Sequence, residues 1–372
     1  MNLIDRLDAA LGAEGYRMRK SSPRGTTRLV LEVAGADGGI AAAQWFADAA
    51  QATEAARLVR ARFGADSVSV LADGHLVLQH AGADRKLPVV HRLAARPGSV
   101  LVAHRAERRA VVRTTDGHYV KVVRPDRVHE LVRPLESLLI DDVRTPQVVE
   151  VDERLGCVTT AAMPGRTLHA RLLDRSVPDA DVVRDAHVTG TALRALHSQS
   201  PELTRPPHTG AAELDAARRW LDAAVAFDLL DAGASTPAFD AVASAVLRGE
   251  EPMTAVHRDF HDKQVLVDNG GGVGILDLDL ACAGEPSVDV GNLVAHLHLR
   301  RSQGLVAEAR ASEATAAFLD GYGEPAVRPE RFEAYVASTW LRLAGVYLFR
   351  PSRPGLSEDL LDRALTSVAV VH

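Results

Sequence analysis

Residues 254–292 read TAVHRDFHDKQVLVDNGGGVGILDLDLACAGEPSVDVGN. Two short apolar runs, QVLV and VGIL, flank the turn Asp268-Asn269-Gly270-Gly271 within this stretch. Because Asn and Gly tolerate positive φ, the pattern predicts a β-hairpin. A polar loop containing Asp259 precedes the hairpin, and Asp277 follows its second apolar run. We therefore expect the hairpin to bring these two carboxylates to one end of a sheet.

Two carboxylates in this arrangement match the needs of phosphoryl transfer. One carboxylate orients an attacking hydroxyl and accepts its proton, and the other holds Mg²⁺ against nucleotide phosphates. Asp259 lies in a His-Arg-Asp triplet, which is a weak signal when it stands alone. The triplet, the Gln five residues after Asp259, the glycine-rich turn and the apolar run ending in Asp-Leu-Asp form a much more specific combination.

Composition excludes several classes of protein. The chain has 372 residues, a formal net charge of −6 and ordinary proportions of hydrophobic and charged residues, so a nucleic-acid partner is not indicated. No run of about 18 apolar residues is found, which argues against a membrane span. The N-terminal segment does not have the pattern of a signal peptide. With only two cysteines, no disulfide framework is expected, and we predict a cytoplasmic protein.

Residues 1–95 are predicted to form a separate α+β unit. Apolar periodicity indicates helices over residues 2–11 and 52–64, and paired strand-like runs turn at residues 35–39 and 72–74. No residue spacing in this unit indicates catalysis, so we expect it to be structural or to act as a cap over a substrate. The segment from Arg85 to Gly98, which contains two prolines, is interpreted as a linker.

Residues 99–163 are expected to form a small twisted sheet with one helix. Lys121 lies within the β-prone run HYVKVVR, and the helical segment DRVHELVRPLESLL follows it with Glu130 and Glu136. A strand Lys followed by a helical Glu is the pair that holds the α and β phosphates in a protein-kinase-like small lobe. Pro134 should interrupt the helix, which favours Glu130 as the partner of Lys121.

Residues 164–372 are predicted to be mainly helical, apart from the stretch quoted first. Between residues 174 and 251 the sequence has 13 acidic and seven basic residues. An acidic surplus of this kind usually lies on a solvated helix face, but it is also compatible with a cationic acceptor substrate.

The stretches VHRDFHDKQVLV and GILDLDLACAGEPSVDVGN resemble the aminoglycoside phosphotransferase and choline-kinase-like branch of the protein-kinase-like fold. The resemblance extends over about residues 99–350 and includes MPGRTL (163–168), ALRALHS (192–198) and FLDGY (318–322). It implies an α+β fold of two lobes, a small β-rich lobe and a larger helical lobe, with residues 1–95 as an extra N-terminal α+β cap domain. It also implies an ATP- and Mg²⁺-dependent kinase that phosphorylates a hydroxyl of a small polar metabolite.

The resemblance assigns roles to individual residues. Asp259 would be the catalytic base, and Asp277 would bind Mg²⁺. Gln264 stands where most of the family has Asn and would be a second Mg²⁺ ligand through its side-chain oxygen. Lys121 and Glu130 would bind the nucleotide phosphates.

Three further residues would support the site. His257 would brace the loop by hydrogen bonds, and Asp289 would anchor the loop backbone. Asp279 would approach the metal or cap the following turn.

Three departures from the family pattern bear on function. Gln264 is longer than Asn by one methylene group, and Arg258 replaces the usual Gly. The loop HRAERR between the first two strands of the small lobe has no glycine. Arg105, Arg108 and Arg109 are therefore candidates to reach the phosphates by side chain, and the alternative is that they are simply solvated. Maltokinase-like and glucosamine-kinase-like members resemble this chain in having Gln at that position and an extra N-terminal domain. The acceptor is therefore expected to be a sugar, an amino sugar or an aminoglycoside.

Two alternative functions stay open from the sequence. A non-catalytic pseudokinase would bind a nucleotide or a partner, and the unusual Gln264 is compatible with that role. A two-metal hydrolase would use His257, His261 and the neighbouring carboxylates as metal ligands. We expect His261 and Asp262 to lie at the loop surface instead.

Overall fold

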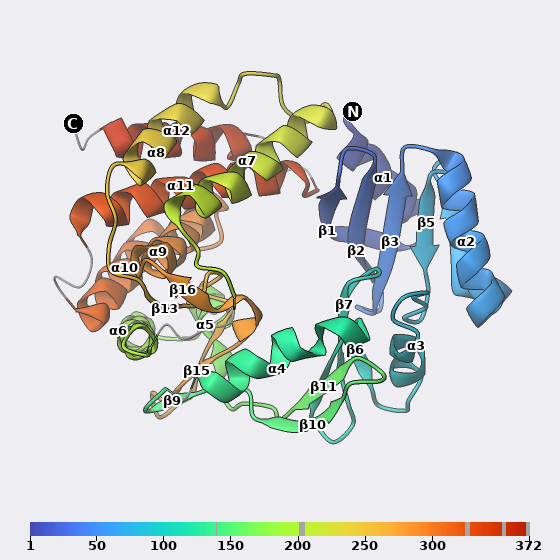
Figure 1. The fold of residues 1–372 in the computed structure, drawn as a ribbon, viewed down its shortest axis with the longest axis horizontal. Helices are drawn as coiled ribbons and strands as arrows, with labels where there is room; N and C mark the ends of the chain where they lie inside the picture. The colour runs from blue at the N-terminus through green and yellow to red at the C-terminus, as the bar shows by residue number, and fades with distance from the viewer. Residues whose placement is uncertain (139, 201–204, 324–327, 352–354, 370–372) are drawn as a thin grey trace.

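A computed structural model describes residues 1–138, 140–200, 205–323, 328–351 and 355–369. It has the mixed α+β architecture predicted from the sequence, with a β-rich small lobe and a larger helical lobe. The N-terminal unit lies beside both lobes, and the chain then runs through the small lobe into the large one (Figure 1).

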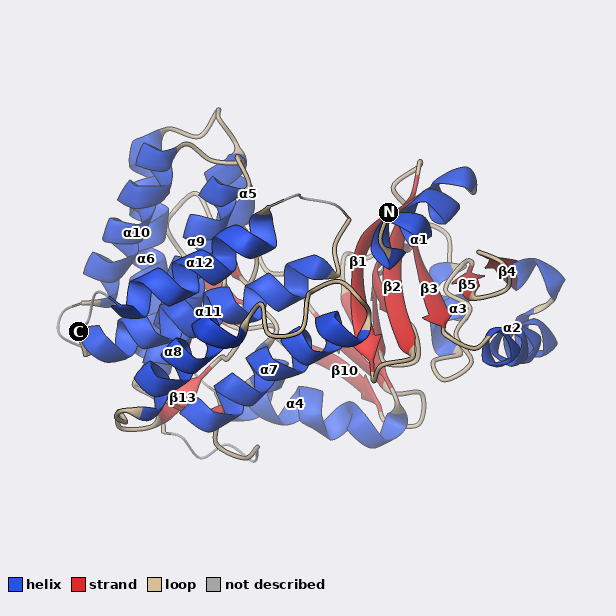
Figure 2. Cartoon of the chain, turned by 90° about the horizontal axis from the view of Figure 1, so that it is seen from above, coloured by secondary structure: helices blue, strands red, loops and turns tan. Residues whose placement is uncertain are grey.

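The N-terminal unit is a sheet covered by helices, as Figure 2 shows in profile. Its five strands follow the order β1-β2-β3-β5-β4. The helices are α1 (Leu3–Ala13) and α2 (Ala49–Phe63), and the strands are β1 (Tyr16–Arg24), β2 (Arg28–Gly35), β3 (Ile40–Phe46), β4 (Val68–Leu71) and β5 (Leu76–Gln79). Both hairpins expected here are confirmed, but β1 was not predicted. Its sequence YRMRKSSPR lacks a simple alternation, and Pro23 is tolerated because β1 is an edge strand.

The expected linker is wrong in part, since it contains the helix α3 (Val89–Ala94). Apolar side chains of this helix pack, together with Leu87, Val112 and Val122, against the face of the small-lobe sheet opposite to Lys121. Burial of this apolar face explains why the segment is helical even though it is short and flanked by prolines.

The small lobe is an antiparallel sheet in the order β10-β11-β8-β7-β6. Its strands are β6 (Val100–Arg105), β7 (Arg109–Arg113), β8 (Tyr119–Val123), β10 (Val148–Asp152) and β11 (Cys157–Thr160). A short 3₁₀ turn (Pro125–Arg127) leads into α4 (Val128–Ser137). The expected break at Pro134 is wrong, because α4 continues through it. Pro134 lies near the middle of this short helix. Because proline has no N–H, the helix lacks only the hydrogen bond from residue 134 to the carbonyl of Glu130.

The large lobe surrounds two small sheets with helices. The sheets have the orders β12-β14-β15-β9 and β13-β16. The strands are β9 (Val143–Arg144), β12 (Arg166–Thr167), β13 (Thr254–Val256), β14 (Val265–Val267), β15 (Val273–Ile275) and β16 (Cys282–Gly284). The helices are α5 (Leu168–Leu173), α6 (Asp179–His197), α7 (Gly210–Ala226), α8 (Thr236–Leu247), α9 (Ser287–Ser302), α10 (Glu308–Tyr322), α11 (Pro329–Leu348) and α12 (Leu356–Ala369). Within the described ranges, no helix combines the length and hydrophobicity that crossing a membrane requires.

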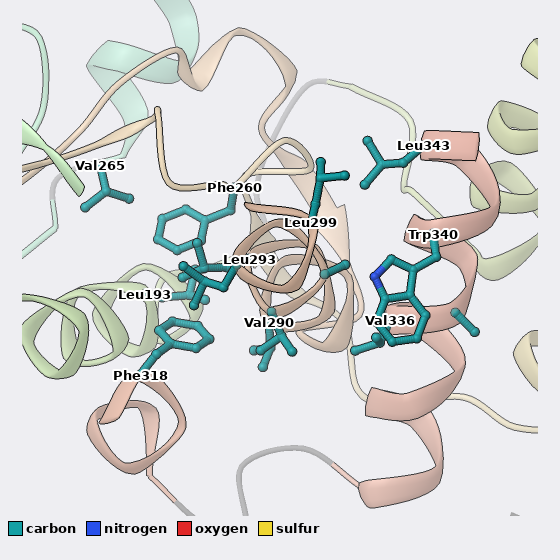
Figure 3. Close-up of a cluster of buried hydrophobic side chains, with 14 of the residues drawn as sticks. Leu193, Phe260, Val265, Val290, Leu293, Leu299, Phe318, Val336, Trp340 and Leu343 are labelled. Carbon is teal, nitrogen blue, oxygen red and sulfur yellow. The ribbon is translucent and has the colours of Figure 1, made fainter. Parts of the chain in front are cut away.

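The main hydrophobic core lies in the large lobe, around α9. Figure 3 shows Phe260, from the loop after β13, inserted beside Leu193, Leu293 and Phe318. Phe260 has no solvent exposure, so the loop that carries Asp259 is anchored from below by a large buried side chain.

The N-terminal unit makes contacts with both lobes. On the small-lobe side, Val30 and Ala42 form a buried cluster with Ala106. On the large-lobe side, the backbone N–H of Ser21 donates a hydrogen bond of 3.1 Å to the carbonyl of Phe349, and Phe349 and Phe227 pack into the core of the unit. The unit therefore connects the two lobes along the side of the cavity described below.

Candidate active site

The loop of residues 257–264, here called the HRD loop, is held by one buried carboxylate. Strand β13 leads into the loop and pairs with β16, which precedes α9. Asp289, in the first turn of α9, accepts hydrogen bonds from the backbone N–H groups of His257 at 2.6 Å and Arg258 at 2.8 Å. These are the contacts that backbone anchoring by Asp289 requires. Arg258 has a φ of 70°, a left-handed conformation in which glycine is favoured, so the anchor stabilises a strained backbone.

His257 also makes only structural contacts. Its Nε2 donates to the carbonyl of Leu276 at 2.7 Å, and its Nδ1 accepts from the backbone N–H of Asp259 at 3.3 Å. Since both ring nitrogens are engaged, the imidazole braces the HRD loop against the strand that leads to Asp277. It has no lone pair left for a metal ion, which removes the main ligand of the two-metal hydrolase considered above.

The carboxylate of Asp259 is accessible. Its side chain is 39% exposed, and Nε2 of His261 lies 3.9 Å from Oδ2. Within the described ranges, its carboxylate oxygens accept no hydrogen bond. A carboxylate fixed by its backbone and free at its oxygens is suited to meet an incoming hydroxyl group.

Asp277 and Asp279 form a compact ion cluster with two cations from the small lobe. The Nζ of Lys121 lies 2.7 Å from Oδ1 of Asp277 and 2.7 Å from Oδ1 of Asp279. Arg109 reaches the same two carboxylates at 3.5 and 3.4 Å. These contacts bring strand β8 and the first residue of β7 directly against the metal-binding candidates.

The two carboxylates differ in their protonation behaviour. Burial opposes ionisation of Asp277, but Lys121 and Arg109 outweigh it and hold the pKa of that carboxyl well below its usual range. Burial, together with the neighbouring charge of Asp277, raises the pKa of Asp279. Asp277 is therefore the firmly ionised member of the pair, as a metal ligand should be.

Gln264 lies opposite Leu276 in the hairpin, and Leu276 directly precedes Asp277. The backbone N–H of Gln264 donates to His261 O, and its carbonyl accepts from Leu276 N–H, both at 2.8 Å. Strands β14 and β15 pair from Val265 and Ile275 onward, as the turn chemistry predicted. The side-chain amide of Gln264 forms no hydrogen bond within the described ranges, so its oxygen is available as a ligand. Carboxylate and amide oxygens are the donor types that Mg²⁺ prefers, and the residues present fit this ion.

The expected pair between Lys121 and Glu130 is not formed. Glu130 instead lies between two guanidinium groups, at 2.6 Å from Arg127 and 2.8 Å from Arg205. Lys121 is already neutralised by two carboxylates, and the two arginines neutralise Glu130, so no charge is left to draw the pair together. Glu130 nevertheless lines the same cavity as Asp259 and Asp277.

The glycine-free loop between β6 and β7 is fixed to the N-terminal unit. Glu107 has a φ of 62° at the turn, and its backbone N–H donates to Asp84 at 2.6 Å. Its buried carboxylate meets Arg28 at 3.1 Å, Arg85 at 2.6 Å and Lys86 at 2.8 Å. The loop is therefore held by ion pairs in place of the close backbone approach that glycines allow.

These elements enclose a cavity of about 620 Å³. Asp259, Asp277 and Asp279 form its large-lobe side, and Arg105 and Arg109 belong to its small-lobe side. Arg24 and Arg28, at the tip of the β1–β2 hairpin, complete it from the N-terminal unit.

Sequence reasoning missed some of these residues. Arg24 and Arg28 flank Gly25-Thr26-Thr27, and this turn would have been a usable signal if β1 had been recognised. Asp262 was expected at the loop surface, which is wrong. It has no solvent exposure and receives two hydrogen bonds of 2.8 Å from Arg300 and one of 2.7 Å from His169. No local pattern reveals this contact, because Arg300 lies 38 residues away on α9.

Comparison with known proteins identifies the family of this chain and its fold. Residues 94–335 match the model of the phosphotransferase enzyme family. A solved structure of a thermostable mutant of aminoglycoside phosphotransferase APH(4)-Ia is similar, with 16% sequence identity and a TM-score of 0.53, over 73% of this chain and 94% of that chain. The structure of aminoglycoside-3'-phosphotransferase of type VIII has 21% identity and a TM-score of 0.48, over 72% of this chain and 94% of that chain.

A choline/ethanolamine kinase family protein from Mesorhizobium loti has 18% identity and a TM-score of 0.49, over 75% of this chain and 97% of that chain. No curated protein matches the chain by sequence. The resemblance stated from the sequence and the protein-kinase-like fold are confirmed.

Proposed function

Since the chain belongs to the phosphotransferase enzyme family, we propose that it transfers the γ-phosphoryl group of ATP to a hydroxyl of a small polar metabolite, with Mg²⁺. The protein is a small-molecule kinase by its family. The observation that supports the ATP reaction best is the placement of the Asp259 carboxylate in one cavity with Asp277, which is ion-paired with Lys121.

Asp259 acts on the acceptor. Its carboxylate orients the hydroxyl and takes its proton late, because the transition state of phosphoryl transfer is loose and positioning matters most. His257 and Asp289 hold the backbone from residue 257 to Asp259 through the hydrogen bonds described above. Phe260 fixes the same loop from the core.

Lys121 and Arg109 act on the nucleotide phosphates. Both cations lie beside Asp277. Phosphates in the cavity would therefore be bound by Lys121 and Arg109 next to the proposed Mg²⁺ ligand. Asp277 and Gln264 would hold Mg²⁺, with Asp279 beside them. When bound, this ion neutralises phosphate charge.

The N-terminal unit takes the role of a cap. The family match begins at residue 94, so residues 1–93 lie outside it. We place the domain limits at 1–95 for the cap, 99–163 for the small lobe and 164–372 for the large lobe. The cap fixes the β6–β7 loop through Glu107 and supplies Arg24 and Arg28 to the cavity.

We also propose that the enzyme works in the cytoplasm. Its two cysteines, Cys157 and Cys282, are buried and are not joined by a disulfide. Unpaired cysteines are usual in a reducing compartment.

The test begins with ATP consumption over sugars, amino sugars, aminoglycosides and amino alcohols. With an acceptor identified, Asp259→Asn should lower kcat by about 10²- to 10⁴-fold, because the general base is lost. The affinity for ATP, measured by calorimetry, should change little. Asp66→Asn, an exposed carboxylate in the cap, is the matched control and should behave as wild type.

Full turnover by the Asp259→Asn variant would show that the base has been assigned wrongly. The pseudokinase remains the second candidate. It would be favoured by ATP binding without consumption of ATP for any acceptor in the screen.

A further inference from the structure

The cavity carries more positive than negative charge. Nine of its lining side chains are basic and five are acidic, a surplus of four basic groups. The acidic surplus noted between residues 174 and 251 does not reach it, since Arg205 is the lining residue that this segment supplies. The walls of the cavity are therefore unsuited to a polycationic acceptor.

Part of this positive charge is balanced by the protein itself. The carboxylate of Glu107 forms an ion pair with Arg28. The carboxylate of Glu130 forms ion pairs with Arg127 and Arg205. By contrast, Arg24, Arg105 and Arg108 form no ion pair within the described residues. The Nε of Arg28 is buried and has no hydrogen-bond partner, although the terminal nitrogen of the same side chain forms the ion pair with Glu107. A buried donor without a partner is unusual in a folded protein and points to a missing acceptor group.

The unpaired arginines lie close enough to repel one another. Burial, and then the charges of Arg108 and Arg105, lower the pKa of Arg24 to about 10. Burial, and then the charges of Arg109 and Arg108, likewise lower the pKa of Arg105. Repulsion of this kind is relieved when an anion enters the space between the guanidinium groups.

MgATP does not use up the positive charge. One Mg²⁺ cancels about half of the roughly four negative charges of a triphosphate, which leaves about two to set against the surplus. Lys121 and Arg109 already stand beside Asp277, where we place the phosphates. Arg24 and Arg28 come from the cap. Arg24 forms no ion pair within the described residues, and the buried Nε of Arg28 has no hydrogen-bond partner, so both have donors left for a second anion.

We propose that Arg24, Arg28, Arg105 and Arg108, here called the arginine cluster, bind an oxyanion group carried by the hydroxyl acceptor, either a phosphate ester or a carboxylate. The planar guanidinium fork matches both groups in a bidentate manner. Asp259 lines the same cavity, and its negative charge counteracts part of the lowering of the Arg105 pKa that burial and the neighbouring arginines cause. An acceptor held by its anionic group at the cluster would thus present a hydroxyl to Asp259. This inference rests on the proposed function and narrows its acceptor to an anionic, sugar-like compound.

The experiment measures binding and turnover separately. The enzyme is saturated with Mg²⁺ and a non-hydrolysable ATP analogue and titrated by calorimetry with glucose 6-phosphate, glucuronate, glucose and glucosamine. At least one anionic compound should bind 10-fold or more tightly than the uncharged and cationic ones, since charged hydrogen bonds to Arg are strong. The two anionic probes separate a phosphate ester from a carboxylate.

Variants then locate the binding group. Arg24→Gln and Arg108→Gln should each weaken the preferred anion by about 10- to 100-fold, with a smaller effect on the ATP analogue. Arg17→Gln, an exposed arginine on the same strand as Arg24, is the control and should not change binding. If no anionic probe binds more tightly than glucose, or if the two variants bind it as wild type does, the inference is wrong. Binding of the ATP analogue in that case would leave the kinase function standing, whereas failure to bind it would remove the kinase function itself.

Discussion

The two sides of the cavity balance their charges in different ways. On the large-lobe side, Asp277 meets Lys121 at 2.7 Å, and Asp289 accepts two backbone N–H groups of the HRD loop. Where the cap meets the β6–β7 loop of the small lobe, Arg24, Arg105 and Arg108 form no ion pair among the residues that the structure describes. One side of the cavity is therefore organised before any ligand arrives, and the other retains unpaired charge.

This difference separates chemistry from recognition. Groups that must be placed accurately in the transition state are fixed by the protein in advance, because reorganisation during the reaction would raise the barrier. Groups that recognise a ligand keep their hydrogen-bonding capacity for that ligand. The variants below test the organised side, and their effects should follow how directly each residue touches the reacting groups.

The largest effect is expected for Asp277→Ala. It removes the ionised carboxylate that we assign to Mg²⁺ and leaves Lys121 and Arg109 facing Asp279 alone. Nucleotide binding should lose its dependence on Mg²⁺, and turnover should fall by about 10³-fold or more. Titration with ATP in the presence and absence of Mg²⁺ measures this directly. Unchanged Mg²⁺-dependent binding would mean that Asp277 does not hold the metal.

The next effect is expected for Asp289→Asn, which acts through the HRD loop. The amide can replace only one of the two oxygens that accept the N–H groups of His257 and Arg258. Because Arg258 is held in a left-handed conformation, the loop should shift and move Asp259. A displacement of about 1 Å lowers turnover by about 10²-fold. The KM for ATP should stay nearly constant, and a parallel loss of nucleotide affinity would indicate general unfolding instead.

A third effect concerns stability and pH at Asp262. Burial would raise its pKa, but Arg300 and His169 outweigh burial and hold the pKa of Asp262 well below its ordinary value of 3.8. The folded state therefore favours the ionised form, so this stabilisation is present above about pH 4 and is lost as the pH falls below that value. Thermal unfolding followed from pH 7 to pH 3 should show this loss.

Asp262→Asn should flatten the acid part of that profile. It leaves Arg300 buried without its charge partner, which costs about 3–5 kcal/mol. The double variant Asp262→Asn with Arg300→Met is the control, and it should recover part of the stability because no unpaired charge remains. If the single variant keeps the acid dependence of wild type, another carboxylate is responsible.

Local sequence predicted the organised side of the cavity better than the other side. Turn chemistry at residues 268–271 was sufficient for the hairpin, and the hairpin fixes where Gln264 and Asp277 lie. The contact between Lys121 and Asp277 joins residues 156 positions apart and was not predicted, since the sequence paired Lys121 with Glu130. Arg24 and Arg28 could not be assigned to the cavity, because a contact between a cap hairpin and a distant loop leaves no pattern in either segment. For the same reason, the burial of Asp262 depends on α9 and not on the loop sequence.

The smallest effect is expected for Gln264→Asn, although Gln264 departs from the family pattern. The backbone of Gln264 is fixed by hydrogen bonds of 2.8 Å on both sides, so the hairpin cannot move to follow a shorter side chain. The Asn oxygen would then stop about one bond length, roughly 1.5 Å, short of the ion that Gln reaches. Because Asp277 remains and water can fill the gap, the Mg²⁺ concentration needed for half-maximal activity should rise by only about 3- to 10-fold.

Gln264→Ala is the matched comparison and should have a larger effect, since it removes the oxygen altogether. Equal activity of all three proteins at limiting Mg²⁺ would show that the side chain of Gln264 is not a ligand, and the organised side of the cavity would then hold the metal through its carboxylates alone.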